Sequence, residues 1–196
     1  MNDATNTASS EQDQAPDVFD IVPPHLAIRA MRSSGFKSTD HAVAELIDNS
    51  IQAGLAAGND TTNVEVICVE RLVSVGSKNT KRIDEIIVYD NASGMDPELL
   101  RKALMFGHGT NLDPESQKGI GKFGMGLPNA SISQCRKVDV YSWRDGKCFR
   151  AYMNVDHILS GRMREVPKPE EVEFPKHYAE LIKSQIEGSG TLVVWR

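Results

Sequence analysis

Apolar residues recur every four positions in one stretch of the N-terminal half of the chain. Three β-branched residues keep this spacing, with Leu46 beside them, namely Val43, Ile47 and Ile51. The spacing matches one face of an α-helix. Ser38-Thr39-Asp40, just before it, offers candidate N-cap residues. The pattern therefore predicts a helix whose apolar stripe packs on a core.

Five other stretches are rich in apolar and β-branched residues and have the length of strands. They cover residues 64–72, 83–89, 137–143, 147–153 and 191–195. The second is the most continuously apolar, so we expect it inside a sheet. Arg144-Asp145-Gly146 separates the third from the fourth. An Asp-Gly pair supplies the positive φ that a tight hairpin needs, so these two strands are expected to pair.

The order of the expected elements favours one fold class. Further helices are expected over residues 25–31, 97–106, 127–134 and 177–186, and residues 156–175 have the composition of a loop. This order lacks the regular strand–helix alternation of a doubly wound parallel sheet. It favours an α+β sandwich, with one mixed sheet and helices on one face.

The first 18 residues contain almost no bulky apolar side chains, so we expect them to form a disordered tail. Residues 19–196 are then expected to form a single domain, which the total length allows. The last expected strand stops at the chain end. A domain rarely ends on a bare apolar strand, so we expect the chain to be a fragment of a longer protein.

Composition excludes several classes of protein. The chain has 22 basic and 27 acidic side chains, and this net charge of −5 argues against a generic basic nucleic-acid footprint, although not against a local basic patch. Cys68, Cys135 and Cys148 lack metal-ligand spacing, and their odd number suits a reducing compartment. No apolar run approaches 18 residues and no signal-peptide core is present, so we expect an intracellular, cytoplasmic protein without membrane contact, or a nuclear one in a eukaryote.

Glu45 and Asn49 are four residues apart on the first expected helix, so their side chains share a face, roughly opposite Val43 and Ile47. A carboxylate can orient and deprotonate a water molecule. A carboxamide oxygen is a neutral ligand that Mg²⁺ accepts. A solvated polar face is the alternative interpretation of the pair. Asp48, between the two, is expected to be a surface carboxylate.

Asp90 directly follows the most apolar strand and opens the turn-forming segment DNASGM, which ends at Met95. A buried carboxylate there can accept a hydrogen bond from the exocyclic amine of adenine, whereas guanine presents a carbonyl at that position. Gly94 would let the backbone approach a flat ring, and the hydroxyl of Thr191 on the last strand could support Asp90. An ordinary turn is the alternative, because Asp, Asn, Ser and Gly are turn residues.

Residues 107–126 hold six glycines. GIGKFG within them matches GxGxxG, but polar residues precede it, so the dinucleotide-binding context fails, and a P-loop would need Gly-Lys-Ser/Thr. What remains is a glycine-rich segment that leads into a helix N-terminus, whose free N–H groups and dipole bind anions such as a triphosphate. Phe123, Met125 and Leu127 alternate with glycines, which favours packing over a loose surface loop.

Together these segments resemble the GHKL superfamily of ATPases, which includes gyrase, the ninety-kilodalton heat-shock chaperone, histidine kinases and MutL. AVAELIDNSIQAG resembles the N box, DNASGM the box usually written DxGxG, GIGKFGMG the glycine box at the end of the lid, and SGTLVVW the closing strand. The glycine box has a form similar to that of the heat-shock chaperone and of microrchidia (MORC) ATPases, and the closing strand has a MORC-like form. The resemblance covers about residues 26–195 and implies a Bergerat-type two-layer sandwich with an ATP lid over about 107–122.

The resemblance implies a role for each matching residue. Glu45 would be the general base, and Asn49 would hold Mg²⁺. Asp90 would bind the adenine amine with Thr191 behind it, and Gly94 and Met95 would lie against the ring. The backbones of Gly121, Gly124 and Gly126 would cradle the phosphates, and Phe123 and Met125 of the same glycine box would also contact the nucleotide. Lys122 would either touch phosphate or be solvated.

Two departures from the family pattern affect the expected activity. Ala92 stands where the family usually has a glycine, which is tolerable if its φ is negative. Many relatives also take a phosphate-contacting lysine from a second domain, which would lie after Arg196. We therefore expect slow hydrolysis of Mg-ATP to ADP and phosphate. Lid closure would drive homodimerisation, with a downstream domain of the same chain as a further partner. A histidine-kinase-type catalytic domain and a binding module without hydrolysis remain alternatives, and the client, DNA or protein, stays open.

Overall fold

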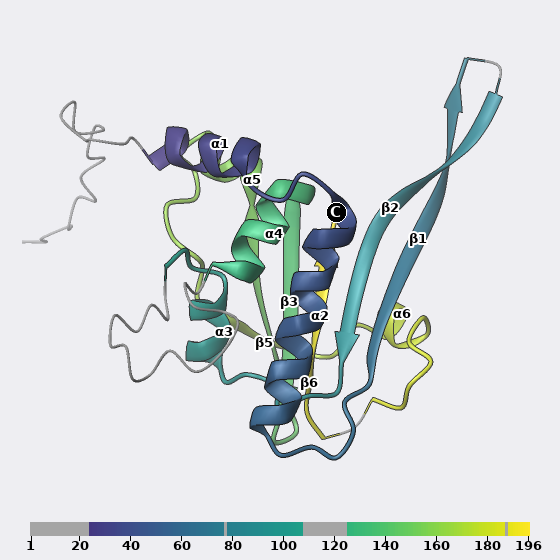
Figure 1. Ribbon diagram of the computed structural model, residues 1–196, viewed down its shortest axis with the longest axis vertical. Coiled ribbons are helices and arrows are strands. Elements are labelled where there is room, and N and C mark those ends of the chain that lie inside the picture. The colour runs from purple at the N-terminus through teal and green to yellow at the C-terminus, as the bar shows by residue number, and fades with distance from the viewer. Residues whose placement is uncertain (1–23, 77, 108–124, 187) are drawn as a thin grey trace, which may run out of the picture.

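The computed structural model describes residues 24–76, 78–107, 125–186 and 188–196 (Figure 1). The expected N-terminal tail lies outside these ranges. So do almost all of the expected lid and the glycine-box residues Gly121, Lys122, Phe123 and Gly124. The described helices are α1 (Pro24–Ser34), α2 (Thr39–Ala56), α3 (Pro97–Ala103), α4 (Gly126–Gln134), α5 (Val155–Leu159) and α6 (Lys176–Ala179). The described strands are β1 (Val64–Val75), β2 (Lys78–Asp90), β3 (Lys137–Arg144), β4 (Lys147–Asn154), β5 (Glu170–Val172) and β6 (Gly190–Trp195).

The strands form one six-stranded sheet in the order β1-β2-β6-β3-β4-β5. The expected α+β sandwich is confirmed, but every described strand pairing is antiparallel, so the expectation of a mixed sheet is wrong. The last strand of the chain inserts between two hairpins and becomes central. Its side chains explain this position, because Leu192 and Val194 are buried on one face of the sheet and Val193 and Trp195 on the other.

The sheet carries an apolar core on each face. One core lies under α1, α2, α3 and α4 and includes Leu46, Leu100 and Ile132 with Val88 and Val140 of the sheet. The other lies under the chain around α6, where Tyr178 and Ile182 pack on Ile87, Tyr89 and Leu192. Helices were expected on one face only, and the short α6 corrects that expectation. No helix of the described part is both long and apolar enough to cross a membrane.

Helix α2 buries a different stripe from the one that its apolar residues suggest. Its buried residues are Ala42, Leu46, Ser50 and Gly54, whereas Ile51 is 43% exposed. A Cβ at Gly54 would overlap the hydroxyl of Thr62, so the helix approaches its neighbours where its residues are small. Glu45 and Asn49 each precede a buried residue. They are therefore half-buried at the border of the packed face rather than fully turned away from it.

The bounds of several helices and strands differ from those expected from the sequence. The turn between β3 and β4 is confirmed, with positive φ at Asp145 and Gly146. Helix α3 begins at Pro97 after Asp96, whose side chain accepts a hydrogen bond from Leu99 N. It ends at Ala103 rather than near residue 106, and α6 has four residues rather than ten. The expected loop over 156–175 contains most of α5 and all of β5.

The sheet face that carries α6 also buries a charge. Asp139 of β3 is fully buried, and one of its oxygens accepts a hydrogen bond from Arg150 Nε at 2.8 Å. Its second oxygen has Lys137 Nζ at 3.3 Å and Arg196 Nη1 at 3.4 Å, within ion-pair distance but without hydrogen-bond geometry. Arg196 also bonds to Tyr178, at 2.7 Å from its hydroxyl. These contacts tie α6 to the centre of the sheet.

Candidate functional site

Three polar side chains lie directly opposite one another on neighbouring strands. The strand register pairs Asp90 of β2 with Thr191 of β6, and Thr191 with Ser142 of β3. Neighbours in each strand, such as Tyr89 and Leu192, belong to the core on the α6 side. Because successive side chains alternate between the two faces of a sheet, the three polar residues face the helical layer. They form a polar row at one end of the sheet face whose remaining buried residues belong to the apolar core under the helices.

The Asp90 carboxylate is buried and accepts three hydrogen bonds. Oδ1 accepts from the backbone amide of Ala92 at 3.0 Å and from that of Thr191 at 3.1 Å. Oδ2 accepts from the hydroxyl of Ser50 at 2.7 Å. Burial raises the pKa of Asp90, and the three hydrogen bonds offset part of that effect. The expected support from Thr191 comes from its backbone amide, since its hydroxyl lies 3.4 Å from that of Ser142.

Ser50 connects helix α2 to this carboxylate. It is buried, one residue after Asn49, and its Oγ also lies 3.1 Å from the carbonyl oxygen of Leu46. Sequence reasoning missed Ser50 as a site residue. The sequence contains a signal for it, because Ser50 follows the apolar Leu46 by four residues and therefore lies on the same helix face.

The turn after β2 is held against β3 and β6. Gly94 has a φ of +61°, and a Cβ there would overlap the backbone carbonyl oxygen of Trp143. The amide of Met95 donates to Ser142 Oγ at 2.8 Å, and Ser142 Oγ lies 3.0 Å from the carbonyl oxygen of Gly190. Gly94 is therefore required by its contact with β3, whatever ligand approaches the turn. Ser142 was not expected from the sequence, where it is a polar residue inside an apolar strand.

Ala92 fits its position without backbone strain. Asp145 is the one non-glycine residue with positive φ in the described ranges, so the φ of Ala92 is not positive. Its methyl group is buried, its amide bonds Asp90, and its carbonyl oxygen accepts from Ser189 Oγ at 2.7 Å. An alanine in place of the usual glycine therefore leaves the geometry of the turn intact.

Glu45 lies against the beginning of α4. A Cβ at Gly126 would overlap Oε1 of Glu45, so the carboxylate occupies the space that this glycine leaves open. Helix α4 begins there without a side-chain cap on its first turn, and a negative charge near a helix N-terminus is favourable. Partial burial, and to a lesser extent the charge of Asp48, raises the pKa of Glu45. A carboxylate with a raised pKa is a stronger base than an exposed one.

The structure brings most of the described candidates to one region. Glu45 and Asn49 lie one turn apart on α2, and Ser50 of the same helix bonds Asp90. Met95 packs on the core under the helices, and Met125, which precedes α4, is 38% exposed. Among the described residues, no group of three or more His, Cys, Asp or Glu side chains could hold a metal ion.

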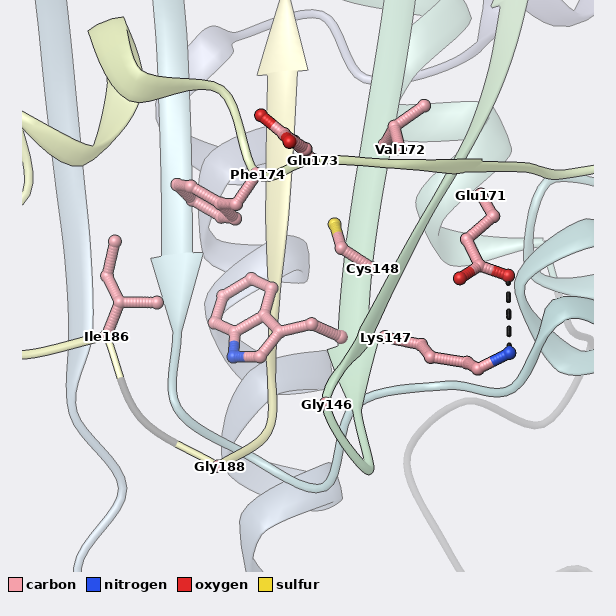
Figure 2. Close-up of a pocket in the computed structure, with 10 residues that line it drawn as sticks. Gly146, Lys147, Cys148, Glu171, Val172, Glu173, Phe174, Ile186 and Gly188 are labelled. Atoms are coloured by element: carbon pink, nitrogen blue, oxygen red, sulfur yellow. Dashed lines mark hydrogen bonds and ion pairs between the residues drawn. The ribbon is translucent and has the colours of Figure 1, made fainter.

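A cavity of about 660 Å³ lies on the other face of the sheet (Figure 2). Phe174, Ile186, Val172 and Cys148 supply its apolar wall, and Lys147 and Glu171 form an ion pair at 3.3 Å beside it. Burial raises the pKa of Cys148 to about 11, so its thiol is protonated at neutral pH. None of the candidate site residues named from the sequence lines this cavity.

Comparison with known proteins gives two findings. Residues 37–189 match the family described as histidine kinase-, DNA gyrase B-, and HSP90-like ATPase. The chain is also similar to Protein MICRORCHIDIA 7 of Arabidopsis thaliana, at 28% identity over 145 residues. That alignment covers 74% of this chain and 19% of the plant protein, so the chain spans about a fifth of the length of this relative.

Two of the glycines with positive φ, Gly94 and Gly58, provide a matched test of the turn. Gly58 has φ +73° and open space where a Cβ would point, whereas Gly94 faces the Trp143 carbonyl. Gly58→Ala should cost about 1–2 kcal/mol from backbone strain alone. Gly94→Ala should cost about 3 kcal/mol or more, because β3 must also shift. Urea unfolding measures both values, and equal losses would contradict the close packing of Gly94 on β3.

Asp90→Asn should change how stability depends on pH. The raised pKa of Asp90 gives a contribution to stability that is complete below about pH 3.9, the unfolded value, and is lost as pH rises through the folded value. The side-chain oxygen of an asparagine at this position can still accept hydrogen bonds from the backbone amides of Ala92 and Thr191. The asparagine also offers an N–H to Ser50, whose hydroxyl can then donate to Leu46. Thermal unfolding from pH 4 to 7 should therefore show the variant gaining stability relative to the wild type as pH rises. A pH-independent difference in Tm would contradict the raised pKa.

Proposed function

The chain belongs to the histidine kinase-, DNA gyrase B- and HSP90-like ATPases, and we propose that this domain binds Mg-ATP and hydrolyses it slowly to ADP and phosphate. Family membership itself indicates nucleotide binding and ATPase activity. The observation that supports our assignment of the site is the buried Asp90 carboxylate, which three hydrogen bonds hold at the edge of the helical layer.

Asp90 is suited to recognise adenine. Two of its three hydrogen bonds go to Oδ1, and Oδ2 has one partner, Ser50. A carboxylate oxygen has two lone pairs, so Oδ2 keeps the capacity to accept from the exocyclic amine of adenine. Guanine presents a carbonyl oxygen at that position, and two acceptors facing each other would be unfavourable. In this proposal the Gly94–Met95 backbone lies along the ring, and the Thr191 and Ser142 hydroxyls complete the polar row.

Glu45 is our proposed general base. Its carboxylate lies beside the N-terminus of α4, the helix that follows the glycine box. Phosphates bound at that helix end would meet free N–H groups and the positive end of the helix dipole. A water molecule between Glu45 and the terminal phosphate could then be oriented and deprotonated for in-line attack. The raised pKa of Glu45 makes it a stronger base than an exposed glutamate.

Asn49 is our proposed protein ligand for Mg²⁺. It follows Glu45 by one helical turn and is half-buried on the same side of α2. Mg²⁺ keeps several waters and is usually bound through few protein oxygens together with substrate phosphates, which fits a site with one carboxamide. When bound, the ion would neutralise charge on the phosphates. Our proposed phosphate-binding residues are Gly121, Lys122, Phe123, Gly124, Met125 and Gly126.

The biological role that we propose is a nucleotide-driven switch. ATP would close the glycine-rich segment over about residues 107–122, the closed form would dimerise, and hydrolysis would reset it, following the order–disorder logic of other nucleotide switches. The chain covers a fifth of its plant relative. In the same proposal, a lysine from a further domain contacts the phosphates, and the switch acts on a client that is DNA or protein.

Glu45→Gln tests the chemical step and separates hydrolysis from binding. The amide keeps the shape of the side chain but cannot accept the proton from water. Phosphate release should therefore fall about 100-fold or more, while Mg-ATP should still raise the Tm of the variant, because binding stabilises the folded state by mass action. Wild-type hydrolysis by this variant would overturn the base assignment. A wild-type chain that is stabilised by Mg-ATP without releasing phosphate would instead be a binding module.

Asp48→Asn is the matched control on the same helix. Asp48 is exposed, and its charge helps to raise the pKa of Glu45. Its removal should lower that pKa, so the acid limb of the pH–rate profile should move to lower pH with the plateau rate unchanged. A fall in the plateau rate equal to that of Glu45→Gln would indicate a general disturbance of α2.

A further inference from the structure

The hairpin of β1 and β2 extends well beyond the sheet (Figure 1). Strand β6 pairs with β2 only from Ile86 to Asp90, so the outer part of the hairpin is a two-stranded arm. The arm comprises six cross-strand pairs, from Glu70 opposite Ile83 to Val75 opposite Lys78. At about 3.3 Å per residue, it projects by about 20 Å.

The arm concentrates positive charge in an acidic chain. Residues 71–82 contain Arg71, Lys78, Lys81 and Arg82 and no acidic residue, whereas the rest of the chain has 18 basic and 27 acidic side chains. All four cations are exposed. Charges of either sign would protect a free strand edge against aggregation, so edge protection alone does not explain why four of the five charged residues of the arm are positive.

The register gathers three of these cations on one face. Arg71 lies directly opposite Arg82, Val73 opposite Thr80, and Val75 opposite Lys78. Directly opposite residues share a face, and every second residue returns to it, so Arg71, Lys78 and Arg82 form what we call the basic face of the arm. Like charges directly opposite each other destabilise an antiparallel pair. A ligand with closely spaced negative charges would remove this repulsion.

The charges of the basic face are available to a ligand. Within the described ranges, neither Lys78 nor Arg82 has an acidic side chain at ion-pair distance, and Arg71 forms an exposed pair with Asp84 at 2.8 Å. Exposed ion pairs contribute little to stability, so Asp84 can be replaced as the partner. Lys81 differs from these three, because it lies on the opposite face and pairs with Glu70 at 2.8 Å.

We propose that the basic face of the arm binds the phosphate backbone of double-stranded nucleic acid. A two-stranded ribbon has dimensions that a major groove about 12 Å wide admits. Lys78 belongs to the outermost pair, farther from the start of the arm than the screening length of about 8 Å at physiological salt, so the acidic body repels a duplex only weakly there. Arg71 and Arg82 lie one pair from the start of the arm, where a duplex would have to displace Asp84. The negative charge of the whole chain is therefore compatible with local binding through this arm.

Salt-dependent binding to a 20-base-pair DNA duplex of mixed sequence tests the proposal with the full 196-residue chain. Three phosphate contacts predict a slope of about −2.7 for log K against log salt, measured by fluorescence anisotropy. A fourfold rise in salt should then weaken binding about 40-fold. Lys78→Gln with Arg82→Gln should reduce the slope in magnitude by about 1.8.

The control variant combines Lys81→Gln with Lys168→Gln. It removes the same charge from the opposite face of the arm and from an exposed position of the body, and its slope should match that of the wild type. Both double variants should keep the Tm of the wild type and its response to Mg-ATP, which separates this test from that of the proposed function. An equal loss in the control would overturn the proposal. So would no duplex binding at 25 mM salt, or tighter binding to labelled polyglutamate, which would indicate an acidic protein surface instead.

Discussion

The buried carboxylate of Asp90 is the constraint on which the rest of the site depends. A buried carboxylate is costly unless hydrogen bonds compensate it, and here the compensation comes from three parts of the fold. Ser50 belongs to α2, Ala92 to the turn after β2, and Thr191 to β6. The same three contacts that satisfy Asp90 therefore fix the helix, the turn and the central strand relative to one another.

This arrangement explains how distant segments become one site. Ser50 holds α2 at the sheet, and Glu45 and Asn49 precede it on the same helix, so their distance from the polar row is set by helical geometry. At the other end of the site, Glu45 fills the space that Gly126 leaves at the beginning of α4. The hydroxyl of Ser142 connects the turn to β6 through Met95 and Gly190. A change at any of these contacts is expected to alter both local stability and the position of the functional groups.

The sequence predicted what depends on local pattern and missed what depends on packing. The α+β class, the β3–β4 turn at Asp145 and the start of α3 were all accessible, because their signals lie within a few residues. The buried face of α2 was not, since Ala42, Ser50 and Gly54 are buried for their small size and not for their hydrophobicity. Ser50 and Ser142 became visible as site residues only through partners that lie 40 and 47 residues away. The central place of β6 was hidden because it arises from pairing with two hairpins, although its two apolar faces are consistent with it.

The central claim is that Asp90 recognises the exocyclic amine of adenine. The most direct test is the ratio of the Kd for purine riboside triphosphate, which lacks that amine, to the Kd for ATP, measured with wild type and with Asp90→Asn. A hydrogen bond to a charged acceptor contributes about 1.5–3 kcal/mol, so the wild type should bind the amine-free nucleotide about 10- to 150-fold more weakly. In Asp90→Asn the two nucleotides should differ much less. An equal preference for ATP in both proteins would contradict the account.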